Sequence, residues 1–171
     1  MASKDELLDQ IVPLRKKYIK YRDYANETID DIFSAGKIKS AKIYHCEQLA
    51  SGILYNNGGL QFSFKPLPLE AQFSRVYGVE VNDFDSDGTK DILLAGNFYP
   101  YRVQLGQSDA SLGLLLKRKD KTSYQPVQPQ ESGCFIGGDV RSMVPIKDKA
   151  GNSYLFIGKN NSQMQVLKVI K

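Results

Sequence analysis

The stretch DFDSDGTKDILLAG, residues 83–96, joins an acidic loop to an apolar run with the composition of a buried β-strand. Four carboxylates alternate with other residues, and Gly88 falls where a tight backbone turn is needed. In the order of an ion-binding loop, the oxygen ligands on offer are the side chains of Asp83, Asp85, Asp87 and Asp91 and the main-chain carbonyl of Thr89. The loop therefore predicts a metal site between two strands.

Calcium is the metal that this pattern favours. It takes about six to eight oxygen ligands in a flexible arrangement, whereas magnesium demands a tighter octahedron. An EF-hand would need a glutamate at position 12 of the loop and a helix on each side, but Leu94 holds that position and both flanks have strand composition. A strand–loop–strand calcium site is the leading interpretation, and a polar hairpin turn that binds no metal is the alternative.

Short apolar runs, separated by Gly, Asn, Asp and Pro, follow one another through residues 41–171. Their content of β-branched and aromatic residues and their spacing predict a meander of antiparallel strands. The expected strands are AKIYHC (41–46), SGILYN (51–56), LQFSFK (60–65), RVYGVEV (75–81), DILLAGN (91–97), YRVQL (101–105), GLLLKR (113–118), VRSMVPI (140–146), SYLFIG (153–158) and MQVLKVI (164–170).

A weak internal repeat relates two of these regions. VYGVEVNDFDSDGTKDILLAGN (76–97) can be laid over VRSMVPIKDKAGNSYLFIGKNN (140–161), at an offset of about 64 residues, as strand, polar turn and strand. The second turn, KDKAGNS, keeps only Asp148 of the acidic residues. Such repeats are typical of β-propellers, whose blades are antiparallel sheets. We therefore expect a mainly β fold with about two propeller-type blades, too few to close a ring.

The first part of the chain has a helical pattern. Between Lys4 and Ser34 apolar residues recur at intervals of three and four. Pro13 is expected to divide this segment into a short helix and a longer one, and Gly36 to end the second. The predicted organisation is an N-terminal helical segment over residues 1–40 and a β-repeat domain over residues 41–171.

The charge and hydropathy of the chain bear on two functional classes, nucleic-acid binding and membrane insertion. The net charge is +4, and the densest basic group, Arg15 to Lys17, shares its predicted helix with acidic residues, which indicates a solvated helix face. Nucleic-acid (RNA) binding through these basic helices is kept as the alternative function. No apolar run approaches the roughly 20 residues that span a bilayer, and no signal-peptide pattern is seen.

Catalytic chemistry has little support, and the chain is predicted not to be an enzyme. His45 is the single histidine and has no acidic or nucleophilic neighbour with an evident role. Cys46 and Cys134 lack zinc-site spacing and are either joined in a disulfide or free thiols. A polysaccharide-active enzyme would need a carboxylate pair outside the acidic loop, and the sequence suggests none.

Three aromatic residues, Phe98, Tyr99 and Tyr101, follow the strand after the acidic loop. Exposed rings at this position would stack on a sugar or contact a protein partner. Packing within the fold is the alternative.

Two motifs carry a family resemblance. NNGGLQFSFKPLP (56–68), followed by VNDFDSDGTKDILLAGN (81–97), resembles an FG-GAP or VCBS-type repeat, as in bacterial surface proteins and the propeller of integrin alpha subunits. A fainter similarity continues to residue 171 and is to the C-terminal part of VCBS repeat-containing proteins of the Bacteroidetes type, related to the ASPIC/UnbV group.

The resemblance implies a calcium-binding propeller module that serves binding or adhesion outside the cytoplasm, in the periplasm or at the cell surface. It implies structural calcium and a protein or carbohydrate ligand. It places calcium on Asp83, Asp85, Asp87, Thr89 and Asp91. The helical first segment and the small number of strands depart from the family pattern, so either the chain is a fragment or it completes its β-sheet by self-association.

Overall fold

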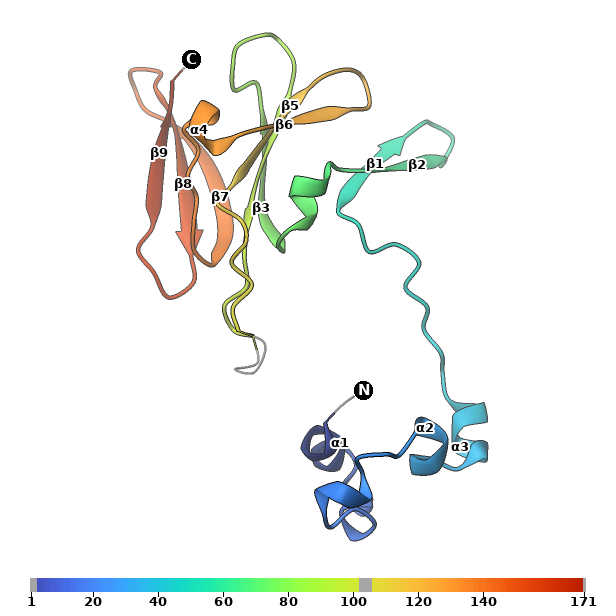
Figure 1. The fold of residues 1–171 in the computed structure, drawn as a ribbon. Helices are drawn as coiled ribbons and strands as arrows, with labels where there is room; N and C mark the ends of the chain where they lie inside the picture. Colours follow the sequence, from blue (N-terminus) through green and yellow to red (C-terminus); the bar gives the residue numbers. More distant parts are fainter. Residues whose placement is uncertain (1–2, 102–105, 171) are drawn as a thin grey trace. The chain divides into compact units, whose positions relative to one another are not determined.

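The computed structural model describes residues 3–101 and 106–170, and its fold is mainly β, with three antiparallel sheets and several short helices (Figure 1). The chain divides into two compact units, Met1–Glu47 (unit 1) and Gln48–Lys171 (unit 2). The helical segment forms most of unit 1, and every strand of the described chain belongs to unit 2.

Unit 1 consists of short helices rather than the long one expected after Pro13, so that prediction was wrong. Side chains that bond to the main chain start new helices instead; Asp31, for example, accepts the Thr28 N–H at 2.9 Å. Gly36, which was expected to end a helix, lies within the last helix of unit 1 instead. The elements are α1 (Lys4–Gln10), η1 (Val12–Lys16), η2 (Tyr21–Asp23), α2 (Ile29–Ile32) and α3 (Ala35–Ser40), the η elements being 3₁₀-helices.

The apolar positions of this segment still serve one small core. Leu8 of α1, Tyr18 of the connection between η1 and η2, and Ile32 of α2 are buried together. The periodicity that predicted a long helix is therefore satisfied by short helical pieces that pack on one another.

Unit 2 contains three antiparallel sheets, with strand orders β1-β2, β3-β4-β5-β6 and β7-β8-β9. The strands are β1 (Gly52–Asn56), β2 (Phe62–Pro66), β3 (Val76–Asn82), β4 (Asp91–Gly96), β5 (Leu114–Arg118), β6 (Tyr124–Val127), β7 (Val140–Lys147), β8 (Ser153–Lys159) and β9 (Gln165–Val169). Two short helices, η3 (Leu69–Gln72) and α4 (Pro129–Ser132), lie in the connections.

Three segments differ from the strand prediction. AKIYHC (41–46) forms no strand; Ile43 and Tyr44 stay exposed, and without a neighbouring strand an extended segment gains little. YQPV (124–127) forms β6, which was not predicted, and Pro126 is tolerated there because β6 is the edge of its sheet. In YRVQL (101–105), Tyr101 is outside any strand and the other residues lie outside the described ones.

The hairpins β3–β4 and β7–β8 are structurally equivalent. Each has a register shift near the start of its first strand. In each, the residue after the second strand donates its N–H to the carbonyl of the residue before the first strand: Asn97 to Arg75 at 2.9 Å and Asn160 to Asp139 at 2.7 Å. The hairpins are thus closed in the same way, although the loop 148–152 is three residues shorter than the loop 83–90.

Strand β4 is buried over its whole length. Its alternating side chains enter two different apolar clusters on opposite faces of the sheet. Ile92 and Leu94 pack with Leu116 and Ala71 on one face, which Ile53 of β1 and Leu67, just after β2, help to cover. On the other face, Leu93 and Ala95 pack with Ile136, Val140, Leu155 and Ile157 of the second repeat and the segment before it.

The two cysteines lie in different units, and no disulfide joins them. Burial raises the pKa of the Cys134 thiol to about 11, so this side chain remains protonated at neutral pH and is a poor nucleophile. In the part of the chain that the structure describes, no helix combines the length and the apolar composition that a membrane crossing requires.

Candidate metal centre

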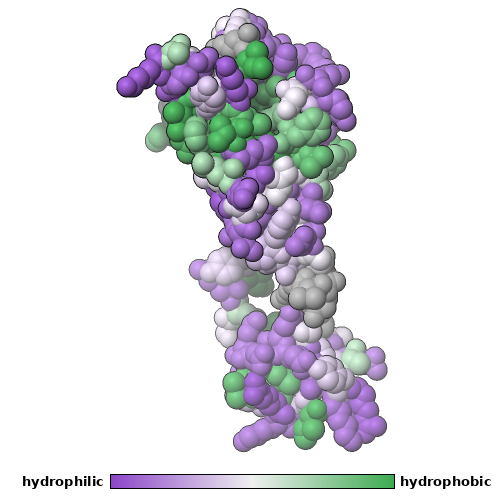
Figure 2. Space-filling model, turned by 90° about the vertical axis from the view of Figure 1, so that its left-hand side faces the viewer, coloured by the Kyte–Doolittle hydropathy of each residue, from purple (hydrophilic) through white to green (hydrophobic). Residues whose placement is uncertain are grey.

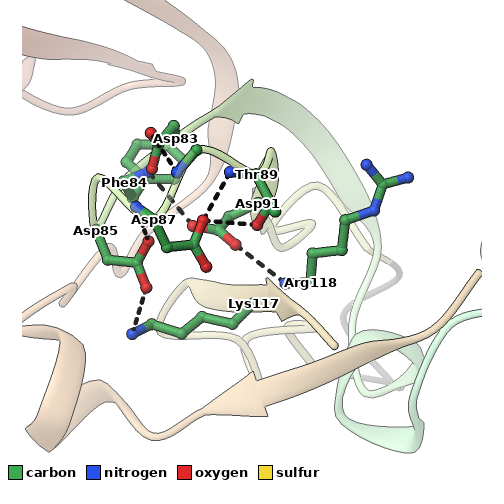
Figure 3. Close-up of polar contacts among 9 residues, drawn as sticks. Asp83, Phe84, Asp85, Asp87, Thr89, Asp91, Lys117 and Arg118 are labelled. Carbon is green, nitrogen blue, oxygen red and sulfur yellow. Dashed lines mark hydrogen bonds and ion pairs between the residues drawn. The ribbon is translucent and has the colours of Figure 1, made fainter. Parts of the chain in front are cut away.

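The acidic loop connects β3 to β4 (Figure 3). The last residue of β3, Asn82, is paired in the sheet with the first residue of β4, Asp91. The chain reverses here through Ser86 (φ 63°) and Gly88 (φ 84°). Positive φ at these two positions curls the loop so that side chains separated in sequence turn toward one centre.

Three carboxylates meet at this centre. Asp83, Asp85 and Asp91 each place one oxygen within 4.8 Å of the others. Asp91 is fully buried; its Oδ1 accepts the Arg118 N–H at 3.0 Å and its Oδ2 accepts the Phe84 N–H at 3.3 Å. The cluster is therefore anchored both to the loop and to the neighbouring strand β5.

Asp83 has one oxygen without a protein partner. Its Oδ2 accepts the Gly88 N–H at 3.2 Å, whereas its Oδ1 is buried and accepts no hydrogen bond. A buried carboxylate oxygen without a donor is costly, and a bound cation would remove that cost. The oxygen is therefore available as a ligand atom for a metal at this position.

The Asp87 side chain binds Thr89 rather than joining the three-carboxylate cluster, although the Asp87 main-chain N–H donates to Asp85 Oδ1 at 3.3 Å. Asp87 Oδ1 accepts both the N–H and the hydroxyl of Thr89, each at 2.7 Å. The structure thus brings together three of the four carboxylates that the sequence assigned to calcium. Asp87 would have to release Thr89 and rotate to become a ligand.

Lys117 was not anticipated by the sequence reasoning. Its Nζ lies 2.9 Å from Asp85 Oδ2, and this ion pair holds the pKa of Asp85 below its ordinary value and raises the pKa of Lys117. The lysine reaches the loop because β5 pairs with β4, a contact that the loop motif does not encode. Its ammonium group occupies Asp85 Oδ2 and would compete with a metal for Asp85.

In the equivalent turn of the second repeat, hydrogen bonds from the protein satisfy the single carboxylate, so no cation is needed there. Asp148 accepts hydrogen bonds from Ala150 N–H (2.9 Å), Asn152 N–H (2.8 Å) and the Asn152 side-chain amide (2.7 Å). By hairpin register, Tyr154 occupies the position of Asp91. One repeat has a carboxylate cluster and the other has a self-satisfied polar turn.

The three aromatic candidates separate into two groups. Phe98 and Tyr101 form an edge-to-face pair with ring centroids 5.9 Å apart, and the Phe98 main chain pairs with Ser108. Among the described residues, Tyr99 takes part in none of the ring contacts. These residues follow the end of β4, whereas the acidic loop precedes its start.

The basic group of unit 1 is largely paired with acids. Arg15 lies 2.7 Å from Asp9 and Lys17 lies 3.5 Å from Glu27, in both cases between charged atoms. Arg22 contacts its neighbour Asp23 at 3.6 Å. These pairs weaken the positive potential that a nucleic acid would meet.

No protein-family model, no curated protein and no solved structure matches this chain. The resemblance to FG-GAP and VCBS repeats therefore stays a prediction based on the loop motif and its flanking strands.

Acid should weaken the fold partly through Asp85. Its pKa is lowered in the folded protein, so its carboxylate stabilises the fold above the unfolded-state pKa of about 4, and that contribution is lost as the pH falls through the folded-state value. Urea denaturation in metal-free buffer should show a shallower loss of stability between about pH 5 and pH 2 for Asp85→Asn than for the parent. Asp109→Asn, at an exposed position outside the loop, is the control. Parallel curves for Asp85→Asn and the parent would contradict the expectation.

Proposed function

We propose that this chain is a non-catalytic, calcium-binding β-repeat module of the propeller type, which binds a protein or carbohydrate outside the cytoplasm. The observation that carries the proposal is the position of Asp91. It is a fully buried member of the carboxylate cluster and also accepts hydrogen bonds from the loop and from β5. A cation on this cluster would join the loop, β4 and β5, so its role is structural.

The sheet order supports the blade interpretation. The strands β3-β4-β5-β6 form a four-stranded antiparallel meander, the usual content of one propeller blade, and β7-β8-β9 repeat its first three strands. The location outside the cytoplasm and the adhesive role follow from the family resemblance.

A hydrolytic role is less well supported than a binding role. Calcium needs the loop carboxylates ionised, so they do not serve as a general acid. Burial raises the pKa of Glu80 in β3, but its partner in the sheet is Leu93 rather than a second carboxylate.

Calcium should raise the melting temperature, and EDTA should reverse the increase. At a calcium concentration about 100 times the Kd, binding to the folded state alone adds about 2.7 kcal/mol, which corresponds to several degrees for a chain of this size. Differential scanning calorimetry is the measurement. Asp85→Ala should remove the response, whereas Asp148→Ala, at the equivalent turn of the second repeat, should retain it. Equal melting temperatures of the parent in calcium and in EDTA would exclude the metal site.

Removing Lys117 should strengthen calcium binding. The ammonium group neutralises Asp85 and must be displaced by the metal. Its loss should lower the calcium Kd in Lys117→Ala, because the metal would no longer have to displace a positive charge from Asp85. Isothermal titration calorimetry is the measurement, and Lys119→Ala, which removes a lysine just beyond β5, is the control. Weaker calcium binding in Lys117→Ala would show that the lysine does not compete with the metal.

Self-association is part of the proposal, because the outward face of the β7-β8-β9 sheet is apolar. Val144, Phe156 and Val166 stand opposite one another across the three strands. Val144 and Val166 are 49% and 45% exposed. The side of unit 2 nearest β9, seen in Figure 2, carries several hydrophobic patches among hydrophilic ones.

The internal repeat indicates that a second copy fits this face. By hairpin register, Phe156 corresponds to Leu93, which is buried between the two repeats. Val79 corresponds to Met143, which packs into that same interface, yet Val79 is 54% exposed. The uncovered part of this face, around Val79 and Val81, can therefore contact the Phe156 face of another copy, while Ile92 and Leu94 stay packed against Ala71 within the chain. The association is head-to-tail.

The average mass in sedimentation equilibrium should therefore rise with protein concentration. Val144→Lys should suppress the rise, since it places a charge in the apolar contact. Val12→Lys, at an exposed valine of unit 1, should leave it unchanged. A constant monomer mass of the parent, or equal behaviour of the two variants, would contradict this interface.

A further inference from the structure

A second cluster of side chains lies at the opposite ends of β3 and β4 from the acidic loop. Its centre is the Phe98 ring. Tyr77 stacks on this ring with centroids 6.3 Å apart and an interplanar angle of 28°, and Tyr101 meets it edge-on at 5.9 Å. Tyr77 and Tyr101 keep 42% and 37% of their surface exposed, so the aromatic cluster is open to solvent.

Two guanidinium groups lie against these rings. Arg75 Cζ is 4.5 Å from the centroid of Phe98 and 5.0 Å from that of Tyr101. Arg141 Cζ is 4.2 Å from the centroid of Tyr77 and 5.3 Å from that of Phe98. Both arginines are therefore held in place by cation–π contacts.

Among the described residues, Arg141 forms an ion pair with a carboxylate, whereas Arg75 forms none. Arg141 Nη2 lies 2.6 Å from Oδ1 of the buried Asp139 in an ion pair. Arg75 has only ring partners for its side chain among the described residues, and it is exposed. The cluster thus contains a positioned guanidinium group that faces no carboxylate in the described part of the chain, and such a group binds carboxylate or sulfate oxygens through its planar donors.

A hollow of about 330 Å³ adjoins Arg75, and its lining combines a ring with small polar groups. Among the described residues, those that line it are Arg75, Tyr101, Gly106, Gln107 and Ser108. Ser108 is fixed by two main-chain hydrogen bonds with Phe98, of 2.7 and 3.0 Å. The hollow is therefore supported by the strand pairing beside it.

The geometry points to an anionic saccharide as the ligand of this hollow, with its carboxylate or sulfate on Arg75 and its ring against Tyr101. This inference rests on the proposed binding function and names the ligand class. A sugar ring presents C–H groups to an aromatic face and hydroxyl groups to side chains such as Gln107 and Ser108. An acidic peptide would use the guanidinium group but would have less need of these polar neighbours.

Isothermal titration calorimetry of the full chain in saturating calcium tests the assignment. The probes are a hyaluronan tetrasaccharide (carboxylate), a carrageenan tetrasaccharide (sulfate), neutral maltotetraose and a tetraglutamate peptide. Binding of either anionic saccharide in preference to maltotetraose and the peptide is expected, and the stronger of the two identifies the anion. Binding of neither, equal binding of maltotetraose, or binding of the peptide alone would overturn the assignment.

Variants test the role of Arg75. Arg75→Ala should weaken binding about tenfold or more, because it removes charge-assisted hydrogen bonds. Arg75→Lys should weaken it less, since it keeps the charge but loses the planar donors. Arg22→Ala, which removes an exposed arginine of unit 1, should have no effect. Unchanged affinity in Arg75→Ala would place the ligand elsewhere and overturn the inference.

The calcium response separates this inference from the proposed metal site. Arg75→Ala should keep the calcium-dependent rise in melting temperature, which also shows that the variant is folded. If the parent responds to calcium but binds no anionic saccharide, the inference fails and the metal site stands. If it binds the saccharide without responding to calcium, the metal site fails and the ligand assignment stands.

Discussion

The burial of β4 on both faces is the constraint on which the rest of unit 2 depends. Ile92 and Leu94 serve one apolar cluster, and Leu93 and Ala95 serve the other. A strand in this position cannot shift its register by one residue without moving every side chain into the wrong cluster. The hairpin partner β3, the neighbour β5 and the second repeat are all positioned against this single strand.

Buried polar residues mark both ends of β4, and both are satisfied by main-chain groups. Asp91 begins the strand and accepts N–H groups from the loop and from β5. Asn97 follows the strand, and its side chain bonds to main-chain groups of Ser111 and Gly138. A polar residue without partners would be expensive at either position. The acidic loop and the connection to the second repeat thus acquire fixed geometry from the core strand.

The sequence predicted best what depends on local pattern. Alternating acids around a glycine and an apolar run after them were sufficient to place the acidic loop between β3 and β4. Lys117 and Arg75 were not recognised, because lysine and arginine have no local signature and their partners come from other segments.

The wrong predictions of secondary structure also arise where the outcome depends on partners elsewhere in the chain rather than on local pattern. Apolar periodicity in the first segment indicated helix correctly, but side-chain caps such as Asp31 divided it into short pieces. AKIYHC (41–46) has strand composition and lacks a strand to pair with. Pro126 concealed β6, whose position at a sheet edge only the strand order reveals. The assignment of Asp87 to the metal is a separate case: it stays a prediction, and the Asp87 side chain bonds to Thr89 in this structure.

The length of β3 keeps the charges at the two ends of the hairpin far apart. Its seven residues, Val76–Asn82, separate the carboxylate cluster from the Arg75 hollow by about 20 Å at the usual rise per residue. The Debye length at physiological ionic strength is about 8 Å, so charges at the two ends are largely screened from each other. A cation at one end would neither attract nor repel an anion at the other. Any influence of one on the other must pass through the rigidity of the hairpin, and the two ends can change their chemistry independently.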